Sequence, residues 1–126
     1  MNADLLTLAR AVVALPGWEW RPGMLTVDGE RMLVDVACGL MRYIAAPYDE
    51  ESDRDMMDDA VPNLADDATG GVMLALLATT EPVVRVSVWG SDRVAVDTES
   101  GRLRSFSGRT LGEAVAKCAI SRGRWA

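Results

Sequence analysis

The chain of 126 residues contains no histidine. Histidine is the side chain that most often acts as a general base near neutral pH, and it is the commonest metal ligand. Its absence excludes Ser–His and Cys–His nucleophile pairs and makes catalysis harder to build. We therefore expect no catalytic residues and no cofactor, and we predict that the chain is not an enzyme.

Cysteine is scarce as well, with only Cys38 and Cys118, and neither belongs to a CxxC pair. A disulfide framework or a zinc site is therefore not expected. Both cysteines lie within apolar patterns, which favours buried free thiols.

Long apolar runs are also missing. The longest, residues 5–15 and 72–78, are too short or too interrupted to span a bilayer. The first residues lack the basic start of a signal peptide. These features predict a cytoplasmic protein that does not enter a membrane.

What remains suits one folded domain over residues 1–126, because 49% of the residues are hydrophobic and 25% are charged. Apolar residues at helical spacing predict three helices. The first follows an Asn2 cap and ends at Pro16, the second begins near an Asn63 cap and ends before Pro82, and the third runs from a Thr110–Glu113 capping box to Gly123. We interpret Gly70-Gly71 in the second helix as a site of close backbone packing.

Alternating apolar residues predict strands. Trp18–Trp20 and Leu25–Val27 lead into Asp28-Gly29, which favours a type I′ turn and a returning strand over 31–36. Residues 37–48 fit either more sheet or a short helix. Alternation from residue 83 to 106 predicts a three-strand meander. The order predicts an α+β domain, in which the hairpin and meander form an antiparallel sheet packed with about three helices as a layered sandwich.

Three blocks of the sequence resemble small bacteriophage proteins of uncharacterised function. The blocks are residues 15–24 (LPGWEWRPGM), 62–69 (PNLADDAT) and 108–115 (GRTLGEAV). Their order is similar to that of the phage ABA-sandwich domain family. The resemblance implies a phage or prophage origin and a layered α/β architecture, and it implies no catalytic residue. The acidic segment between the first two blocks departs from the family pattern.

That acidic segment dominates the charge of the chain. Residues 49–67 hold nine carboxylates and one arginine, a net charge of −8, whereas the whole chain carries −6 and residues 100–126 carry +5. Carboxylates spaced along an exposed segment imitate nucleic-acid phosphates and fit an arginine-lined groove. The predicted partner-binding residues are Asp49, Glu50, Glu51, Asp53, Asp55, Asp58 and Asp59.

Other interpretations of the same segment stay open. Residues 49–62 also fit a loop or short exposed helix that only aids solubility. The spacing and central glycine of an EF-hand are missing, so we expect no dedicated metal site.

Tryptophan and arginine side chains form a second set of candidates for a ligand site or an interface. The set is Trp18, Trp20, Arg21, Arg122, Arg124 and Trp125. Tryptophan stacks on bases and arginine grips phosphates, but buried tryptophan more often anchors a sheet to a helix. Trp125 fits either an exposed interface anchor or a lid that folds back on the core.

The best hypothesis is a small phage accessory protein that inhibits a host defence complex of the CRISPR or restriction type in the host cytoplasm. It would act as a DNA mimic, with the acidic segment bound in the basic, nucleic-acid-binding groove of a host protein. The alternatives are a module that sequesters a nucleotide signal at a subunit interface, and a minor virion or assembly protein. Direct nucleic-acid binding is not favoured, and a homo-oligomer stays open.

Overall fold

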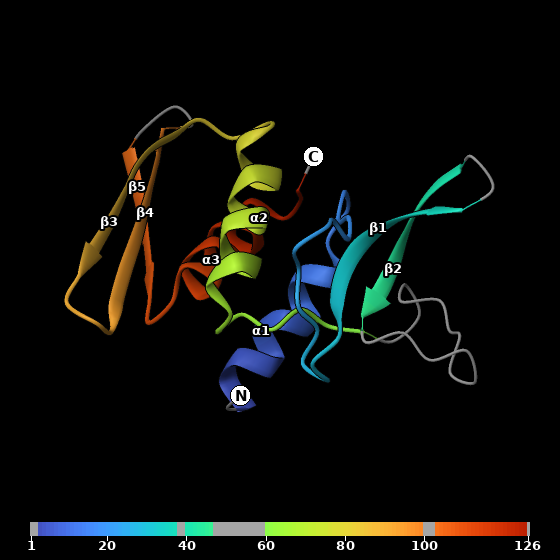
Figure 1. Ribbon diagram of the computed structural model, residues 1–126. Coiled ribbons are helices and arrows are strands. Elements are labelled where there is room, and N and C mark those ends of the chain that lie inside the picture. The colour runs from blue at the N-terminus through green and yellow to red at the C-terminus, as the bar shows by residue number, and fades with distance from the viewer. Residues whose placement is uncertain (1–2, 38–39, 47–59, 100–102, 126) are drawn as a thin grey trace.

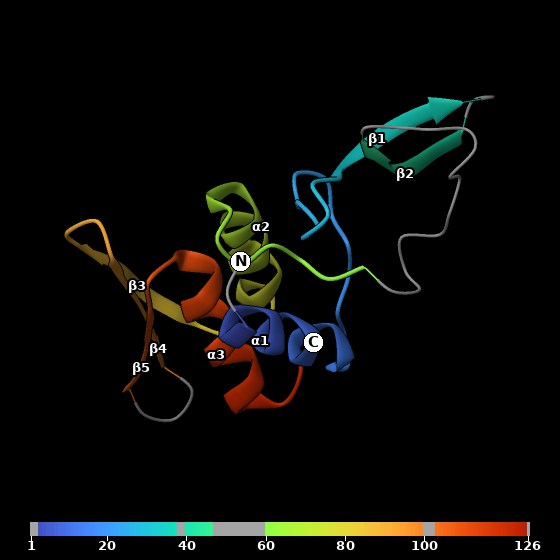
Figure 2. The same ribbon diagram turned by 90° about the horizontal axis from the view of Figure 1, so that it is seen from below.

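The computed structural model describes residues 3–37, 40–46, 60–99 and 103–125. Their elements are α1 (Ala3–Ala14), β1 (Arg31–Ala37), β2 (Leu40–Ala46), α2 (Asp67–Ala78), β3 (Val83–Trp89), β4 (Arg93–Glu99), β5 (Leu103–Gly108) and α3 (Leu111–Arg122). Figure 1 shows the helices between a three-stranded sheet at one end and the β1–β2 hairpin at the other, and Figure 2 shows the same order from below. The predicted α+β class is confirmed, but the hairpin and the meander form two separate sheets and not the one sheet that the sequence predicted.

The three-strand meander is confirmed as an antiparallel sheet with the order β3-β4-β5. β4 is the middle strand, and α3 packs against β4 and β5 while α1 and α2 pack against α3. Val96 of β4 is fully buried beneath these helices. β3 and β5 are the two edges of the sheet.

The last helix follows the sequence pattern closely. The Thr110 hydroxyl accepts a hydrogen bond from the Glu113 N–H at 3.2 Å, and the Glu113 carboxylate accepts one from the Arg109 N–H at 2.8 Å. Gly123, at φ +83°, ends α3 in the left-handed region that glycine favours. The predicted Thr110 cap and the stop glycine are therefore confirmed, whereas the return bond to Glu113 comes from Arg109, one residue before the cap.

The start predicted for the second helix is wrong. Asp66 is the N-cap of α2, because its carboxylate accepts hydrogen bonds from the Thr69 N–H at 2.9 Å and the Thr69 hydroxyl at 2.7 Å. Asn63 accepts from the Ala65 N–H instead, and the Asp66 N–H donates to its carbonyl. Asn63 therefore forms a separate turn before the helix, and an aspartate that also reaches a threonine hydroxyl is the stronger cap.

The hairpin predicted over residues 18–36 is confirmed only next to its turn. Leu25 forms an antiparallel bridge with Arg31, and the Thr26 N–H donates to the Glu30 carbonyl at 2.8 Å. Along its whole length β1 pairs antiparallel with β2, from Arg31 opposite Ala46 to Ala37 opposite Leu40, which resolves residues 40–46 of the ambiguous stretch as a strand. Residues 18–20 are not a strand. The physical reason is the Pro22-Gly23 step, because proline has no N–H for a ladder and Gly23 turns the chain at φ +98°.

The turn expected at Asp28-Gly29 is also of another kind. The Gly29 N–H donates to the Thr26 carbonyl at 3.1 Å, so Val27 and Asp28 are the central residues, and Gly29 follows at φ +90°. A type I′ turn centred on Asp28-Gly29 would instead join the Glu30 N–H to the Val27 carbonyl, one residue later. The longer turn lets Thr26 form an isolated bridge with Pro62.

The core lies between the helices and the inner face of the sheet. Val12, Met73, Leu77 and Val115 are fully buried there, and Cys118 is buried as a free thiol as predicted. Cys38 and the Asn2 cap lie outside the described residues. No helix in the described part of the chain is long and apolar enough to cross a membrane.

Candidate functional site

The seven acidic residues predicted to bind a partner, residues 49–59, lie outside the described part of the chain. Residues 60–62, which the sequence placed at the end of the same loop, are described. The Val27 N–H donates to the Val61 carbonyl at 3.0 Å, and Ala60 and Pro62 are buried. The acidic segment is therefore anchored to the folded domain at its C-terminal end.

Three of the predicted tryptophans meet in one cluster. The rings of Trp18 and Trp20 are 5.4 Å apart and nearly perpendicular, and the Trp18 and Trp125 rings are also 5.4 Å apart. Trp20 is 4% exposed, and the indole N–H of Trp18 is buried with no hydrogen-bond partner among the described residues. The cluster joins the segment after α1 to the end of the chain, as an internal anchor would.

Trp125 follows the second of its two predicted alternatives. Its side chain is fully buried, and its indole N–H donates to the Val12 carbonyl at 2.9 Å. Its backbone N–H donates to Pro16, and its carbonyl accepts from the Thr80 hydroxyl at 2.9 Å. The residue folds back on the core and presents no aromatic surface to a partner in this conformation.

The predicted arginines do not form one site. Arg21 pairs with Glu19 at 3.1 Å on the surface. Arg122 is largely buried, donates to the Thr80 hydroxyl at 2.6 Å and lies 3.6 Å from the Glu81 carboxylate, so its role is structural. Arg124 is exposed beside the buried end of the chain.

The residues that stand out on the described surface lie on β3, and the sequence prediction did not select them as a site. Val86, Val88 and Trp89 are 39%, 67% and 54% exposed, and in the described part of the chain no other large apolar side chain is exposed. The alternation of this strand was visible in the sequence. The sequence did not show which part of this strand the helices leave uncovered.

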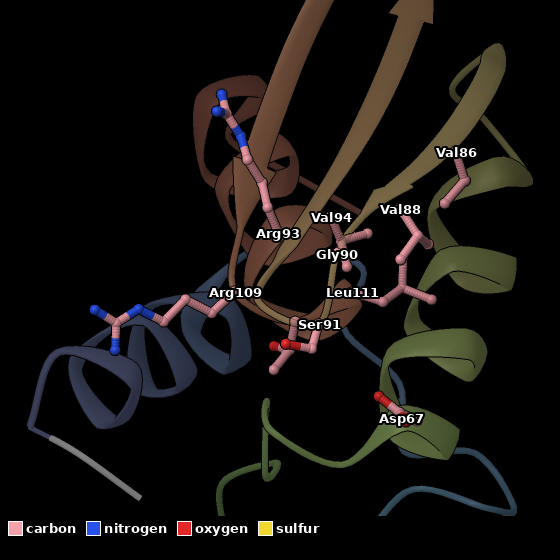
Figure 3. Close-up of a pocket in the computed structure, with 10 residues that line it drawn as sticks. Asp67, Val86, Val88, Gly90, Ser91, Arg93, Val94, Arg109 and Leu111 are labelled. Atoms are coloured by element: carbon pink, nitrogen blue, oxygen red, sulfur yellow. The ribbon is translucent and has the colours of Figure 1, made fainter.

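An apolar hollow of about 410 Å³ lies between β3 and α2. Figure 3 shows Val86, Val88, Val94 and Leu111 around it, with Asp67 and Ser91 at its rim. The helices cover the middle of the sheet and leave this side of β3 open. Its wall is apolar and its rim polar, which is typical of a surface that receives a polypeptide.

The outer face of α2 adds to this apolar surface. Beyond Asp67 and Thr69 the helix has no polar residue, yet four small residues along it are exposed: Ala68, Gly71, Ala75 and Ala78. A helix that is apolar on all sides is normally buried. In the described chain nothing covers this face.

The opposite side of the β3–β4 turn is cationic. The Arg93 guanidinium stacks on the Trp89 ring, 4.9 Å from its centroid. Figure 3 shows Arg93 and Arg109 extending away from the valines. Both arginines line a second, shallow hollow of about 470 Å³ with Lys117, Asp92 and Glu113, and the Lys117 ammonium lies 3.4 Å from the Glu113 carboxylate. Among the described residues neither Arg93 nor Arg109 has a carboxylate within salt-bridge distance.

A third hollow, of about 260 Å³, contains the buried Cys118 with Glu81 and Arg122. Burial and, after it, the charge of Glu81 raise the pKa of the Cys118 thiol to about 11. A thiol with so high a pKa is almost entirely protonated at neutral pH, which does not favour a nucleophile. Among the residues that the structure describes, no cluster of acidic and cysteine side chains could hold a metal ion.

Two aspartates have a lowered pKa for structural reasons. Burial alone would raise the pKa of Asp66, but hydrogen bonds from Arg31, at 3.2 Å, and from Thr69 outweigh it. Hydrogen bonds from Ser105 and then Arg85 lower the pKa of Asp97. Both carboxylates stay charged at neutral pH, so neither is suited to act as a general base there.

Comparison with known proteins does not assign the chain. No family model, no curated protein and no solved structure matches it. The resemblance to the phage ABA-sandwich domain family stays a prediction. What the geometry offers is a contact surface, made of the open strand β3, the hollow beside it and the apolar face of α2.

Proposed function

We propose that the chain is an interaction protein that binds another protein and carries out no chemistry of its own. The observation that carries the proposal is the grouping of Val86, Val88 and Trp89 on one edge strand, at exposures of 39%, 67% and 54%. Val86 and Val88 share one face of the strand, whereas Trp89 lies on the other face beside Arg93. Neighbouring exposed apolar side chains such as the two valines mark interaction sites. The raised pKa of Cys118 and the lowered pKa of Asp66 and Asp97 are consistent with a non-catalytic role.

In its specific form the proposal is an inhibitor of a host defence complex. The acidic segment, residues 49–59, would bind the basic groove in which that complex normally holds nucleic acid. Its support is the charge distribution of the sequence, with a net −8 within residues 49–67 of a chain that carries −6 in all. A phage origin belongs to the same proposal, and it rests on the resemblance alone.

The test compares two neutralised variants in a pull-down from bacterial lysate at low salt. The first replaces the seven acidic residues of 49–59 with Asn or Gln. The control replaces three exposed carboxylates elsewhere: Asp4→Asn, Asp92→Asn and Glu99→Gln. Groove mimicry predicts that the wild type and the control retain the partner, that the first variant loses it, and that raised salt releases it. Equal retention by both variants contradicts the acidic-segment form.

One observation favours a second candidate, the sequestration of a nucleotide. Trp89 is exposed and already stacks with Arg93, and Arg93, Arg109 and Lys117 line the hollow of about 470 Å³. An aromatic face beside cations suits a base and its phosphates. Sequestration predicts that one nucleotide raises the melting temperature, and that Trp89→Leu removes this shift while the acidic-segment substitutions leave it unchanged. A full panel of nucleotides without any shift contradicts it.

A further inference from the structure

The two edges of the three-stranded sheet differ in how they are protected. On β5, α3 lies against the strand, and the Lys117 ammonium donates to the Ser107 carbonyl at 2.9 Å. A Cβ atom added to Gly108 would come within 2.7 Å of Glu113 on α3. A covering helix and a lysine are two of the devices by which proteins block edge-to-edge pairing.

Along most of its length, β3 is less protected against pairing with another strand. A register shift between Val83 and Arg85 disturbs its first residues, and a bulge of this kind blunts an edge. From Arg85 to Trp89 the pairing with β4 is regular. Exposed valines on this stretch favour strand structure, so residues 85–89 form an edge that is able to accept another strand.

We infer that β3 pairs with β3 of a second copy of the chain, antiparallel about a two-fold axis at Ser87, to form a homodimer with a continuous sheet. The inference shares with the proposed function only the premise that the exposed surface is a contact surface. In a two-fold interface each residue faces its symmetry partner, so the strand must be complementary to itself. The side chains of residues 85–89 satisfy this condition.

The first part of the complementarity is apolar. With Ser87 opposite itself, Val86 lies opposite Val88 of the second copy, and Val88 lies opposite Val86. These are the side chains that wall the hollow of about 410 Å³ beside α2. A strand added at this edge would cover the exposed face of both valines and lie beside α2, whose outer residues are small. Neighbouring β-branched pairs across strands stabilise a sheet.

The second part concerns charge. The same register places Arg85 opposite Trp89 of the second copy, and Trp89 keeps its own Arg93 at 4.9 Å on β4. Arg85 keeps its bond to Asp97, at 2.9 Å on the neighbouring strand. No like charges face each other across the axis, and arginine beside an indole is favourable. A foreign peptide would need to supply this pattern, whereas a second copy has it already.

The test measures the mass of the full chain in solution by light scattering over a range of micromolar concentrations. The expected mass of the wild type is twice the chain mass of 13.6 kDa. Val88→Lys introduces a charge at an exposed position and should halve the mass to that of one chain. Ala14→Lys, which places the same residue at an exposed position of α1, should leave the dimer intact. A monomeric wild type, or a Val88→Lys chain that stays dimeric, overturns the inference.

A second measurement leaves Val88 in place and decides the matter if the lysine variant fails to fold. In a Cys38→Ser background, Ser87→Cys should cross-link rapidly with a short bis-maleimide, because residues directly opposite each other lie about 5 Å apart at Cβ. Ala14→Cys, at an exposed position of α1, is the control. Equal rates for the two variants overturn the inference. A monomer that still captures a host protein contradicts only the dimer, and a dimer that captures none contradicts only the proposed function.

Discussion

Replacement of Trp125 by alanine should remove a large part of the stability of the fold. The side chain is fully buried, packs against Trp18 and donates a hydrogen bond to the Val12 carbonyl at 2.9 Å. Truncation of a buried aromatic residue to alanine costs about 3–5 kcal/mol. A domain of this size has a total stability of about 5–15 kcal/mol, so this single residue near the end of the chain accounts for about a fifth of it or more.

Thermal unfolding followed by far-UV circular dichroism measures this effect. At about 4 °C per kcal/mol, the melting temperature of Trp125→Ala should fall by about 12–20 °C. Trp125→Phe keeps most of the buried volume but loses the indole N–H, so a loss of about 1–2 kcal/mol is expected. The two variants together separate the packing of the ring from its hydrogen bond.

Trp89→Ala is the matched control, because it removes the same side chain from a position that is 54% exposed. It loses the stacking with Arg93, worth about 0.5–1 kcal/mol, and should lower stability by about 1 kcal/mol when measured at dilute concentration. Equal shifts for Trp89→Ala and Trp125→Ala would refute the placement of Trp125 in the core. They would reopen the alternative of an exposed interface anchor at the end of the chain.

Three further predictions concern packing, pH and thiol chemistry. Gly70→Ala should destabilise the chain by about 1–3 kcal/mol in thermal unfolding, because its Cβ would lie 2.7 Å from a backbone nitrogen of α3. Gly71→Ala has nothing within 4 Å of its Cβ and should stabilise the chain by about 0.5–1 kcal/mol. Higher stability in both variants would contradict the close helix contact. Since the folded pKa of Asp66 lies below its ordinary value of 3.8, the stability it contributes is complete above that pH and is lost as the pH falls through the lowered folded value. Asp66→Asn, which keeps a good N-cap, should therefore show a shallower loss of stability in acid titrations, and an unchanged slope would refute the role of its charge. With a pKa of about 11 and a buried position, Cys118 in a Cys38→Ser background should react with a thiol reagent at pH 8 only as fast as the chain opens; reaction at the rate of a free thiol would refute its burial.

The elements that the sequence predicts well are those whose ends depend on local chemistry. The cap at Thr110 and the stop at Gly123 need only neighbouring backbone groups, and both are confirmed. The hairpin was only partly predicted, because two segments pair with β1. Residues 23–26 reach only its first residues, and residues 40–46, whose pattern is ambiguous, pair along its whole length.

The candidate surface was harder to predict, because exposure depends on what the tertiary structure covers. The valines of β3 have the pattern of a strand with one buried face, and only the position of α2 leaves Val86 and Val88 open. Trp125 is the opposite case. Its position beside Arg122 and Arg124 in the sequence suggested an anchor, but its own hydrogen bonds hold it inside. The close approach of Gly70 to α3 was predicted because a double glycine in a helix is costly without such a contact.

The central claim, that the chain works by binding another protein, is tested most directly by native mass spectrometry of what the tagged chain retains from bacterial lysate at low salt. The account predicts a complex with a host protein that is lost on raising the salt and lost when the acidic residues of 49–59 are neutralised, but kept in the Asp4, Asp92 and Glu99 control. A chain that emerges with a bound small molecule and no protein in any of these conditions would contradict it.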